Sequence, residues 1–288
     1  MLEMSQIKLS SKMKKLILHI GAPKCGSSAL QSSLEILENN GFLGSRGISY
    51  PLEHSRGLGH GNADLIFKII QSARDNTYDF SQAEEYLVSV GNDTVVLSDE
   101  KLFGVIAPAL SALTKQLSNI FQEIIIYVAI REPSSWLLSD YSQHIKMRVS
   151  SRDFIEHTIE REKHCRWLHY LKVLVNQKQN AVIKVTDYKQ LIPNMEKNLE
   201  FDQGSMSVDR DSTNANISLR GFEMEAHRLA MKLSLNEPEQ MQVLKEEFSD
   251  FDIYNKNHSL LKYLELKNKD YISQIKTLKG IEYMNGFA

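Results

Sequence analysis

Four short apolar runs rich in valine, isoleucine and leucine alternate with stretches of helical periodicity. The runs are Leu16–Ile20, Thr94–Leu97, Ile124–Ile130 and Ala181–Val185. Apolar runs of this length, continuous or with a period of two, are typical of buried strands. Because strand and helix alternate, the sequence predicts an α/β fold, a parallel β-sheet flanked by helices. Ser81 and Glu84 have the spacing of a capping box and predict a helix start before the second run.

Helical periodicity continues beyond the last predicted strand. The segment 198–216 is polar, and leucines at helical spacing return over Leu219–Leu235 and Leu260–Leu278. We therefore expect one domain with a C-terminal helical cap rather than two domains. The expected boundaries are an N-terminal tail over 1–13, a single domain over 14–288, its α/β core over 14–200 and its helical C-terminal part over 217–288.

The charge and the cysteines limit the class of partner. The 288 residues carry 34 Lys and Arg against 36 Asp and Glu. This near balance predicts no nucleic-acid-binding tail, although a local basic cleft is compatible with it. The two cysteines, Cys25 and Cys165, lie far apart and form no paired-cysteine pattern. A disulfide framework is therefore not expected.

The N-terminal residues 1–23 imitate a secretory signal, with lysines before an apolar stretch. That stretch, Leu16–Ile20, is interrupted by His19 and is shorter than an export signal requires. No apolar run reaches the roughly 18 residues that a membrane span needs. We therefore expect no membrane span and a cytoplasmic location in a bacterium.

The stretch "HIGAPKCGSSALQ", residues 19–31, has the glycine spacing of a phosphate-binding loop. Gly21 and Gly26 follow a predicted strand and precede a predicted helix, so backbone N–H groups and the positive end of the helix dipole point at an anion. In ATP- and GTP-binding loops a lysine and then a Ser or Thr follow the second glycine. Here Ser27 and Ser28 follow it, and Lys24 lies inside the loop. The pattern disfavours triphosphate hydrolysis; the alternative is a tight turn without a ligand.

Two segments together resemble one enzyme family. "GAPKCGSSALQ" resembles the 5′-phosphosulfate loop, P-K-x-G-[ST]-[ST], of the sulfotransferases that use 3′-phosphoadenosine 5′-phosphosulfate (PAPS). "IIIYVAIREPSSWLLSDYSQ" is similar to their 3′-phosphate site: Arg131 ends a strand, and Ser139 lies on the helix that Pro133 opens. Arg131 is also compatible with a structural ion pair to Glu132. The resemblance covers about residues 14–220 and implies a P-loop-type sulfotransferase fold.

The resemblance also implies the cofactor. This is PAPS, with 3′,5′-ADP as product and without a metal, and the sequence has no H-x-x-x-H helix or paired-cysteine ligand set. Lys24 is expected to stabilise charge on the leaving oxygen. "NANISLRG" resembles a late N-x-S segment with cofactor contacts. The expected cofactor-binding residues are Lys24, Cys25, Gly26, Ser27, Ser28, Ala29, Arg131, Ser139, Asn216 and Ser218.

Sulfuryl transfer to a hydroxyl needs a general base. "TVVLSDEKLFG" is similar to the S-x-E segment of bacterial and Golgi carbohydrate sulfotransferases, in which a glutamate is the base, and this assigns Glu100. In other interpretations Asp99 and Glu100 only cap a helix, or they form a Walker-B-like magnesium site. His60, in a glycine-rich loop, is the alternative base, because phenol- and steroid-sulfating relatives use a histidine. Their Arg-Lys-Gly phosphate clamp is not visible here.

The sequence therefore predicts a sulfotransferase that moves a sulfuryl group from PAPS to a hydroxyl of a carbohydrate or glycoconjugate. A small-molecule, lipid or polyketide hydroxyl is the alternative acceptor. The alternatives of another class are a P-loop nucleotide kinase or ATPase and a non-catalytic nucleotide-binding protein. The acceptor pocket is expected from the segments 42–75 and 198–216. Nothing in the sequence indicates an oligomeric state.

Overall fold

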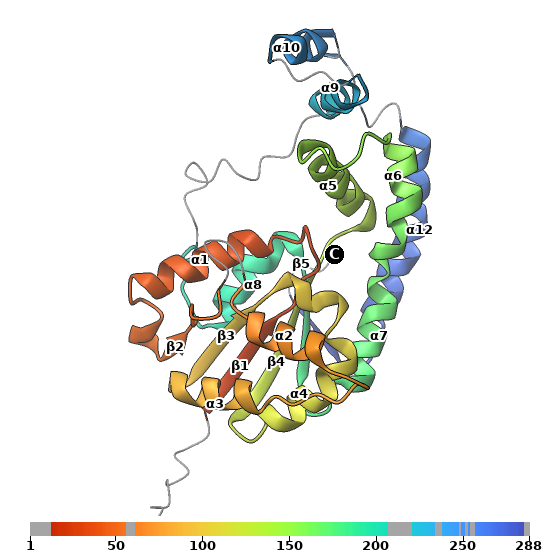
Figure 1. Ribbon diagram of the computed structural model, residues 1–288. Coiled ribbons are helices and arrows are strands. Elements are labelled where there is room, and N and C mark those ends of the chain that lie inside the picture. The colour runs from red at the N-terminus through yellow and green to blue at the C-terminus, as the bar shows by residue number, and fades with distance from the viewer. Residues whose placement is uncertain are drawn as a thin grey trace, which may run out of the picture. The chain divides into compact units, whose positions relative to one another are not determined.

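The fold is built on a six-stranded sheet with the strand order β2-β3-β1-β4-β5-β6, in which all paired strands are parallel (Figure 1). The computed structural model describes residues 13–55, 61–206, 221–233, 238–247, 249–250, 253 and 257–284. The strands are β1 (Met13–His19), β2 (Ile48–Ser49), β3 (Thr94–Ser98), β4 (Phe121–Ile130), β5 (Val182–Asp187) and β6 (Ile281–Tyr283). The α/β fold with a parallel sheet is thereby confirmed.

The four predicted strands correspond to β1, β3, β4 and β5, with ends that differ by a few residues. β2 and β6 were not predicted. Each is too short to form an apolar run, and each is held by pairing with one longer neighbour, β3 or β5. β6 lies in the segment 217–288, which was expected to be helical.

Helices connect the strands and form most of the rest of the described chain. They are α1 (Ser27–Asn39), α2 (Asp64–Ser72), α3 (Ser81–Val90), α4 (Leu110–Leu117), α5 (Pro133–Lys146), α6 (Phe154–Arg161), α7 (Trp167–Gln177), α8 (Leu191–Asn198), α9 (Gly221–Lys232), α10 (Pro238–Glu247) and α12 (His258–Lys276). In the described residues, no helix combines the length and the apolar character required to cross a membrane.

The predicted capping box at the start of α3 is wrong. Ser81 is the first helical residue, and both its N–H and its hydroxyl donate to the carboxylate of Asp79, at 2.9 and 2.6 Å. The N–H of Glu84 donates to the carbonyl of Phe80 and not to a serine side chain. The N-cap position is therefore held by Phe80, which makes no side-chain cap.

The chain divides into two compact units. The first comprises 1–130, 170–208 and 278–288 and carries the whole sheet; the second comprises 131–169 and 209–277. In the second unit, α9 and α12 both pack on α5. The expectation of one domain over 14–288 stays a prediction.

β1 lies in the centre of the sheet and is buried on both faces. Leu16, Ile17 and Leu18 are fully buried, and they pair in register with β3 on one side and β4 on the other. The crossover from β1 to β2 runs in the opposite direction along the sheet from the crossover that joins β3 to β4. Right-handed crossovers then place α1 and α4 on opposite faces, as Figure 1 shows.

This reversal makes the carboxyl end of β1 a topological switch point. Ligands of open α/β sheets bind outside the carboxyl ends of the strands at such a point. The last residue of β1, His19, pairs in register with Ser98 of β3 and Tyr127 of β4. The loop that follows His19 is therefore where the fold favours a ligand.

Candidate functional site

The loop between β1 and α1 first follows β4 and then turns. The N–H of Ile20 donates to the carbonyl of Tyr127 (2.9 Å), and the N–H of Ala22 donates to the carbonyl of Ala129 (3.2 Å). The N–H of Cys25 then donates back to the carbonyl of Ala22 (3.2 Å). These bonds attach the loop to the edge of the sheet and fix the point at which it turns.

Two residues of the loop have left-handed backbone angles, Lys24 with φ 67° and Gly26 with φ 85°. Glycine adopts this region without a steric penalty, whereas Lys24 carries a Cβ and is strained. Strained non-glycine residues concentrate at functional sites. Cys25, between the two, is fully buried, so its side chain lies in the core. Cys25 and Cys165 are not joined by a disulfide.

α1 begins at Ser27 without a side-chain cap and without an acidic residue in its first turn. The first N–H groups of a helix have no acceptor within the helix, and the aligned peptides leave a partial positive charge there. An external anion satisfies both. Ser28 and Ala29, at this helix start, are exposed. The structure thus brings together the six predicted cofactor-binding residues of the loop, Lys24, Cys25, Gly26, Ser27, Ser28 and Ala29.

Two buried side-chain atoms beside this loop have no hydrogen-bond partner. They are Nε2 of His19, which is fully buried, and Oγ of Ser27, whose residue is 2% exposed. A Cβ on Gly21 would lie 2.6 Å from the former and 3.3 Å from the latter. Buried polar groups in proteins are nearly all hydrogen-bonded, so two exceptions at one place need an explanation. Nothing in the sequence pattern indicated a site role for His19.

The end of β3 lies beside the end of β1. The N–H of Asp99 donates to the carbonyl of His19 (3.1 Å). The Asp99 carboxylate accepts from the N–H of Lys101 (2.9 Å) and caps the short 3-10 helix η2 (Glu100–Gly104). The capping interpretation is therefore correct for Asp99. Glu100 is the first residue of η2 and is half-buried, at the same edge of the sheet as the loop.

The chain after residue 60 is held tightly against the end of β3. Asn62 accepts from the N–H of Ser98 through its side chain (2.7 Å) and donates from its own N–H to the carbonyl of Ser98 (2.9 Å). A Cβ on Gly61 would lie 2.1 Å from the carbonyl oxygen of Ser98 and 2.7 Å from Cα of Asp99. Only a glycine fits there. His60, the predicted alternative base, precedes Gly61 in the sequence and lies outside the described residues, as do Asn216 and Ser218.

Gly61→Ala is expected to lower the free energy of unfolding by about 1–3 kcal/mol, the usual cost of overpacking, because the added methyl group meets backbone atoms that cannot rotate away. Urea unfolding measures this change. Gly104→Ala is the matched control, since a Cβ on Gly104 meets nothing within 4 Å. It should stay within about 0.5 kcal/mol of the parent protein. Equal stability of both variants would show that a methyl group on residue 61 fits beside the end of β3.

Arg131 and Ser139, the predicted 3′-phosphate residues, belong to the second unit. Nε of Arg131 donates to Oγ of Ser135 (2.8 Å), and the Arg131 carbonyl accepts from Nε1 of Trp167 (2.9 Å). Ser135 and Ser139 lie one helical turn apart on α5, and so on the same face. The Glu132 carboxylate caps α5 by accepting from the N–H groups of its first turn.

One group in the described part of the chain has ligand atoms at metal-binding spacing. Asp140, His144 and His157 bring one such atom each within 4.8 Å of one another. However, Oδ2 of Asp140 already accepts from Nε2 of His157 (3.1 Å) and from Nε of Arg161 (2.9 Å). Burial raises the pKa of Asp140, but the hydrogen bonds from His157 and Arg161 outweigh it and lower the pKa below its ordinary value. The cluster fits an ion pair better than a metal centre; the expectation of no metal stays a prediction.

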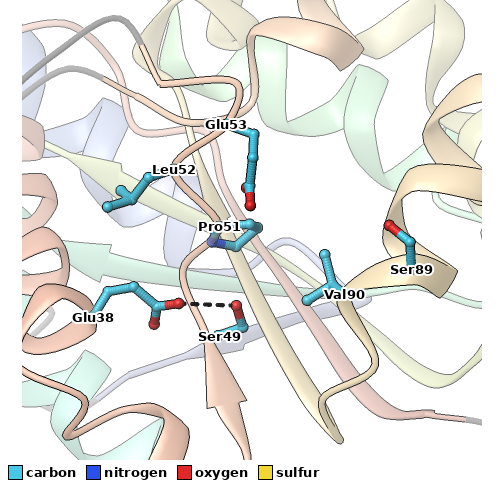
Figure 2. Close-up of a pocket in the computed structure, with 7 residues that line it drawn as sticks. All are labelled: Glu38, Ser49, Pro51, Leu52, Glu53, Ser89 and Val90. Atoms are coloured by element: carbon cyan, nitrogen blue, oxygen red, sulfur yellow. Dashed lines mark hydrogen bonds between the residues drawn. The ribbon is translucent and has the colours of Figure 1, made fainter.

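A separate cavity of about 340 Å³ lies in the first unit (Figure 2). Residues from the predicted acceptor segment 42–75 line part of it. The full lining is Glu38, Ser49, Pro51, Leu52, Glu53, Ser89 and Val90. The Glu38 carboxylate accepts from Oγ of Ser49 (3.2 Å), the contact drawn as a dashed line in Figure 2. Because two carboxylates and no basic side chain line it, this cavity does not suit the phosphates of a nucleotide.

The solved structures that this chain is similar to include two sulfotransferases. The chain is similar to the sulfotransferase from Alicyclobacillus acidocaldarius with a TM-score of 0.37 and 14% identity, over 81% of this chain and 99% of that one. It is similar to the sulfotransferase domain of the Synechococcus PCC 7002 olefin synthase with a TM-score of 0.35 and 12% identity, over 85% and 98%. No family model and no curated protein matches the sequence. Since both TM-scores are low, the function has to be derived from the residues of this chain.

Proposed function

We propose that this chain is a sulfotransferase that transfers a sulfuryl group from PAPS to a hydroxyl group. The observation that carries the proposal is the start of α1, which has no side-chain cap and no acidic residue in its first turn. A strained lysine, Lys24, lies in the loop before it, and two buried atoms without hydrogen-bond partners lie beside it. These groups suit one phosphate with a further negative charge next to it.

PAPS supplies a sulfuryl group attached to its 5′-phosphate through a bridging oxygen; that S–O bond breaks as the acceptor oxygen bonds to sulfur. The N–H groups of residues 26–29 bind the phosphate in this proposal. The Lys24 ammonium stabilises the negative charge that stays with the departing oxygen. The Glu100 carboxylate takes the proton of the acceptor hydroxyl. Charge neutralisation by a lysine and by backbone donors leaves no step that requires a metal.

The kinase or ATPase alternative finds less support. Ser27 stands where an ATP-binding loop carries its lysine, and its hydroxyl is buried. In the Walker-B-like interpretation, Asp99 would hold magnesium. Its carboxylate instead caps η2, and the residue is 1% exposed.

The test of the proposed function is thermal unfolding with three ligands. A ligand that binds only the native state at one hundred times its Kd stabilises it by about 2.7 kcal/mol. We expect 3′,5′-ADP to raise Tm without magnesium, 5′-AMP to raise it less, and ATP with magnesium to raise it least. A larger shift with ATP and magnesium than with 3′,5′-ADP would overturn the proposal in favour of a nucleotide-hydrolysing enzyme.

The acceptor in this proposal is a hydroxyl of a carbohydrate or glycoconjugate. The support is the resemblance of the Ser98–Glu100 segment to carbohydrate-specific relatives, together with the half-buried position of Glu100 at the ligand-binding edge of the sheet. A screen with sulfur-labelled PAPS against saccharides, hydroxylated lipids and polyketide alcohols distinguishes the acceptors. Labelled product from lipids or polyketides alone would transfer the assignment to the alternative class.

Arg131→Ala is expected to weaken binding of 3′,5′-ADP by about 1.5–3 kcal/mol, the range for a hydrogen bond to a charged group. Binding of 5′-AMP should barely change, because it lacks the 3′-phosphate. Isothermal titration calorimetry with both ligands measures the difference. Arg152→Ala is the control, since Arg152 is an exposed arginine of the same unit that pairs with Glu160. Equal losses for the two nucleotides would show that Arg131 does not bind the 3′-phosphate.

A further inference from the structure

The imidazole of His19 is held in a fully buried position at the centre of the sheet edge. Its Nδ1 lies 2.8 Å from Oγ of Ser98, and its Nε2 has no hydrogen-bond partner. Burial lowers the pKa of His19 to about 3. The ring is therefore neutral at physiological pH, and a neutral imidazole carries its single proton on one of the two nitrogens.

The hydrogen bonds around Ser98 select that nitrogen. Nε2 of Gln31 donates to Oγ of Ser98 (3.0 Å), so the serine oxygen is an acceptor in this contact. The serine hydroxyl hydrogen then needs an acceptor of its own, and Nδ1 of His19 lies in reach. With Nδ1 as acceptor, the proton of the neutral ring is on Nε2. The opposite tautomer would leave the buried Ser98 hydrogen without this acceptor.

The protonated nitrogen and the Ser27 hydroxyl converge on the first residue of the loop. Both lie within 3.3 Å of the point where a Cβ on Gly21 would be, so Gly21 leaves the space between them free of a side chain. Both are buried donors without an acceptor in the protein. They lie at the same end of α1 as its uncapped N–H groups. Two donors that converge on one point and have no acceptor in the protein suit an oxygen atom of a bound ligand.

We propose that His19 is a further ligand-binding residue, whose Nε2–H donates, together with the hydroxyl of Ser27, to an oxygen of the anionic group bound by the loop. Ser98 and Gln31 are positioning residues, because they fix the tautomer that makes His19 a donor. The proposal rests on the proposed function only for the identity of the anion. It adds a neutral donor whose strength does not change over the pH range in which the carboxylate base must be ionised.

The direct test uses the intact protein labelled with 15N in its histidines. In the free protein, the His19 resonances should be those of the Nε2-protonated tautomer and should not titrate between about pH 5 and 8, since its pKa is about 3. Saturating 3′,5′-ADP should shift the Nε2–H resonance downfield and give a coupling to phosphorus across the hydrogen bond. An unprotonated Nε2, or an Nε2–H resonance that does not move while the nucleotide binds, would overturn the proposal.

Variants test the same donors by affinity. His19→Leu should weaken 3′,5′-ADP binding about 10- to 100-fold, the loss expected for a hydrogen bond to a charged group. His19→Gln, whose extended amide places a donor near the Nε2 position, should recover most of that loss. Ser98→Ala should leave the His19 ring in place but allow it to populate both neutral tautomers. The 15N chemical shifts of the two ring nitrogens would report that mixture. If His19→Leu does not fold, the spectra of the unmodified protein still decide the question.

Ser27→Ala and Ser33→Ala form a matched pair on α1. Both serines are 2% exposed, but the hydroxyl of Ser33 donates to the carbonyls of Ala29 (2.9 Å) and Met206 (2.8 Å). Ser27→Ala should weaken nucleotide binding about tenfold without loss of thermal stability, because no internal hydrogen bond is lost. Ser33→Ala should lower stability and leave the Kd unchanged. The opposite pattern would show that the Ser27 hydroxyl is not a ligand donor.

Inorganic pyrophosphate separates this proposal from the proposed function. If pyrophosphate shifts the Nε2–H resonance of His19 but 3′,5′-ADP does not bind, the loop binds another anion; the sulfotransferase assignment then fails and the role of His19 stands. If 3′,5′-ADP binds and sulfuryl transfer occurs while the His19 resonance stays unchanged, the role of His19 fails and the function stands.

Discussion

Glu100→Gln is expected to lower turnover by about 10²–10⁴, the usual contribution of a general base. Glutamine keeps the size of the side chain and most of its hydrogen bonds, but it cannot take the proton from an acceptor hydroxyl. The affinity for 3′,5′-ADP should stay within about twofold, because the proposed nucleotide contacts lie on other residues. Steady-state kinetics with sulfur-labelled PAPS and calorimetry with 3′,5′-ADP measure the two quantities.

The control for this variant is Glu84→Gln. Glu84 is also an acid in the first turn of a helix, α3, and it is not part of the proposed site. Loss of a first-turn acid costs about 0.3–1 kcal/mol of stability. If Glu100→Gln shows only such a change in stability and keeps its rate, Glu100 is a helix-start acid like Glu84. A collapse of the rate in His60→Asn with Glu100→Gln still active would assign the base to His60 and weaken the preference for a carbohydrate acceptor.

Lys24→Ala is expected to lower the rate of sulfuryl transfer by about 10²–10³, while product affinity falls by less than about tenfold. The difference arises because the lysine meets charge that develops on the departing oxygen, so its contribution is larger in the transition state than in the bound product. Alanine keeps the Cβ and hence the left-handed backbone strain at φ 67°, and it removes only the ammonium group. Single-turnover kinetics separate the transfer rate from binding.

Lys189→Ala is the matched control for Lys24. Lys189 is an exposed lysine that follows Tyr188, and the carbonyl of Tyr188 lies 3.7 Å from where a Cβ on Gly26 would be. The Lys189→Ala substitution therefore removes a positive charge near the loop without changing the loop itself. Similar rate losses in the two variants would indicate a general electrostatic effect and not a contact of Lys24 with the reacting group.

Most of the sheet could be predicted from the sequence because β1, β3 and β4 are largely buried and therefore contain apolar runs, while β5 alternates buried and half-buried residues. β2 and β6 could not, because strands of two and three residues have no periodicity to detect. Their pairing is decided by the neighbouring strand, which lies far away in the sequence. The capping box of α3 was predicted wrongly for a local reason: the helix begins at Ser81 itself, so Phe80 occupies the N-cap position, and the Ser81 N–H donates to the side chain of Asp79.

The sequence by itself determined the loop, since glycines at fixed spacing between a strand and a helix, with Lys24 between them, restrict the backbone locally. The sequence also determined Glu100 as a candidate base, because Glu100 follows a predicted strand and the carboxyl ends of parallel strands lie at the ligand-binding edge of the sheet. Only the tertiary structure decided which buried atoms face the loop. His19, Ser98 and Gln31 come from three different elements, and their hydrogen bonds exist only because β1 pairs with β3 and α1 packs beside both. Strand register is a long-range property, so no local pattern could show that Nε2 of His19 is buried without a hydrogen-bond partner.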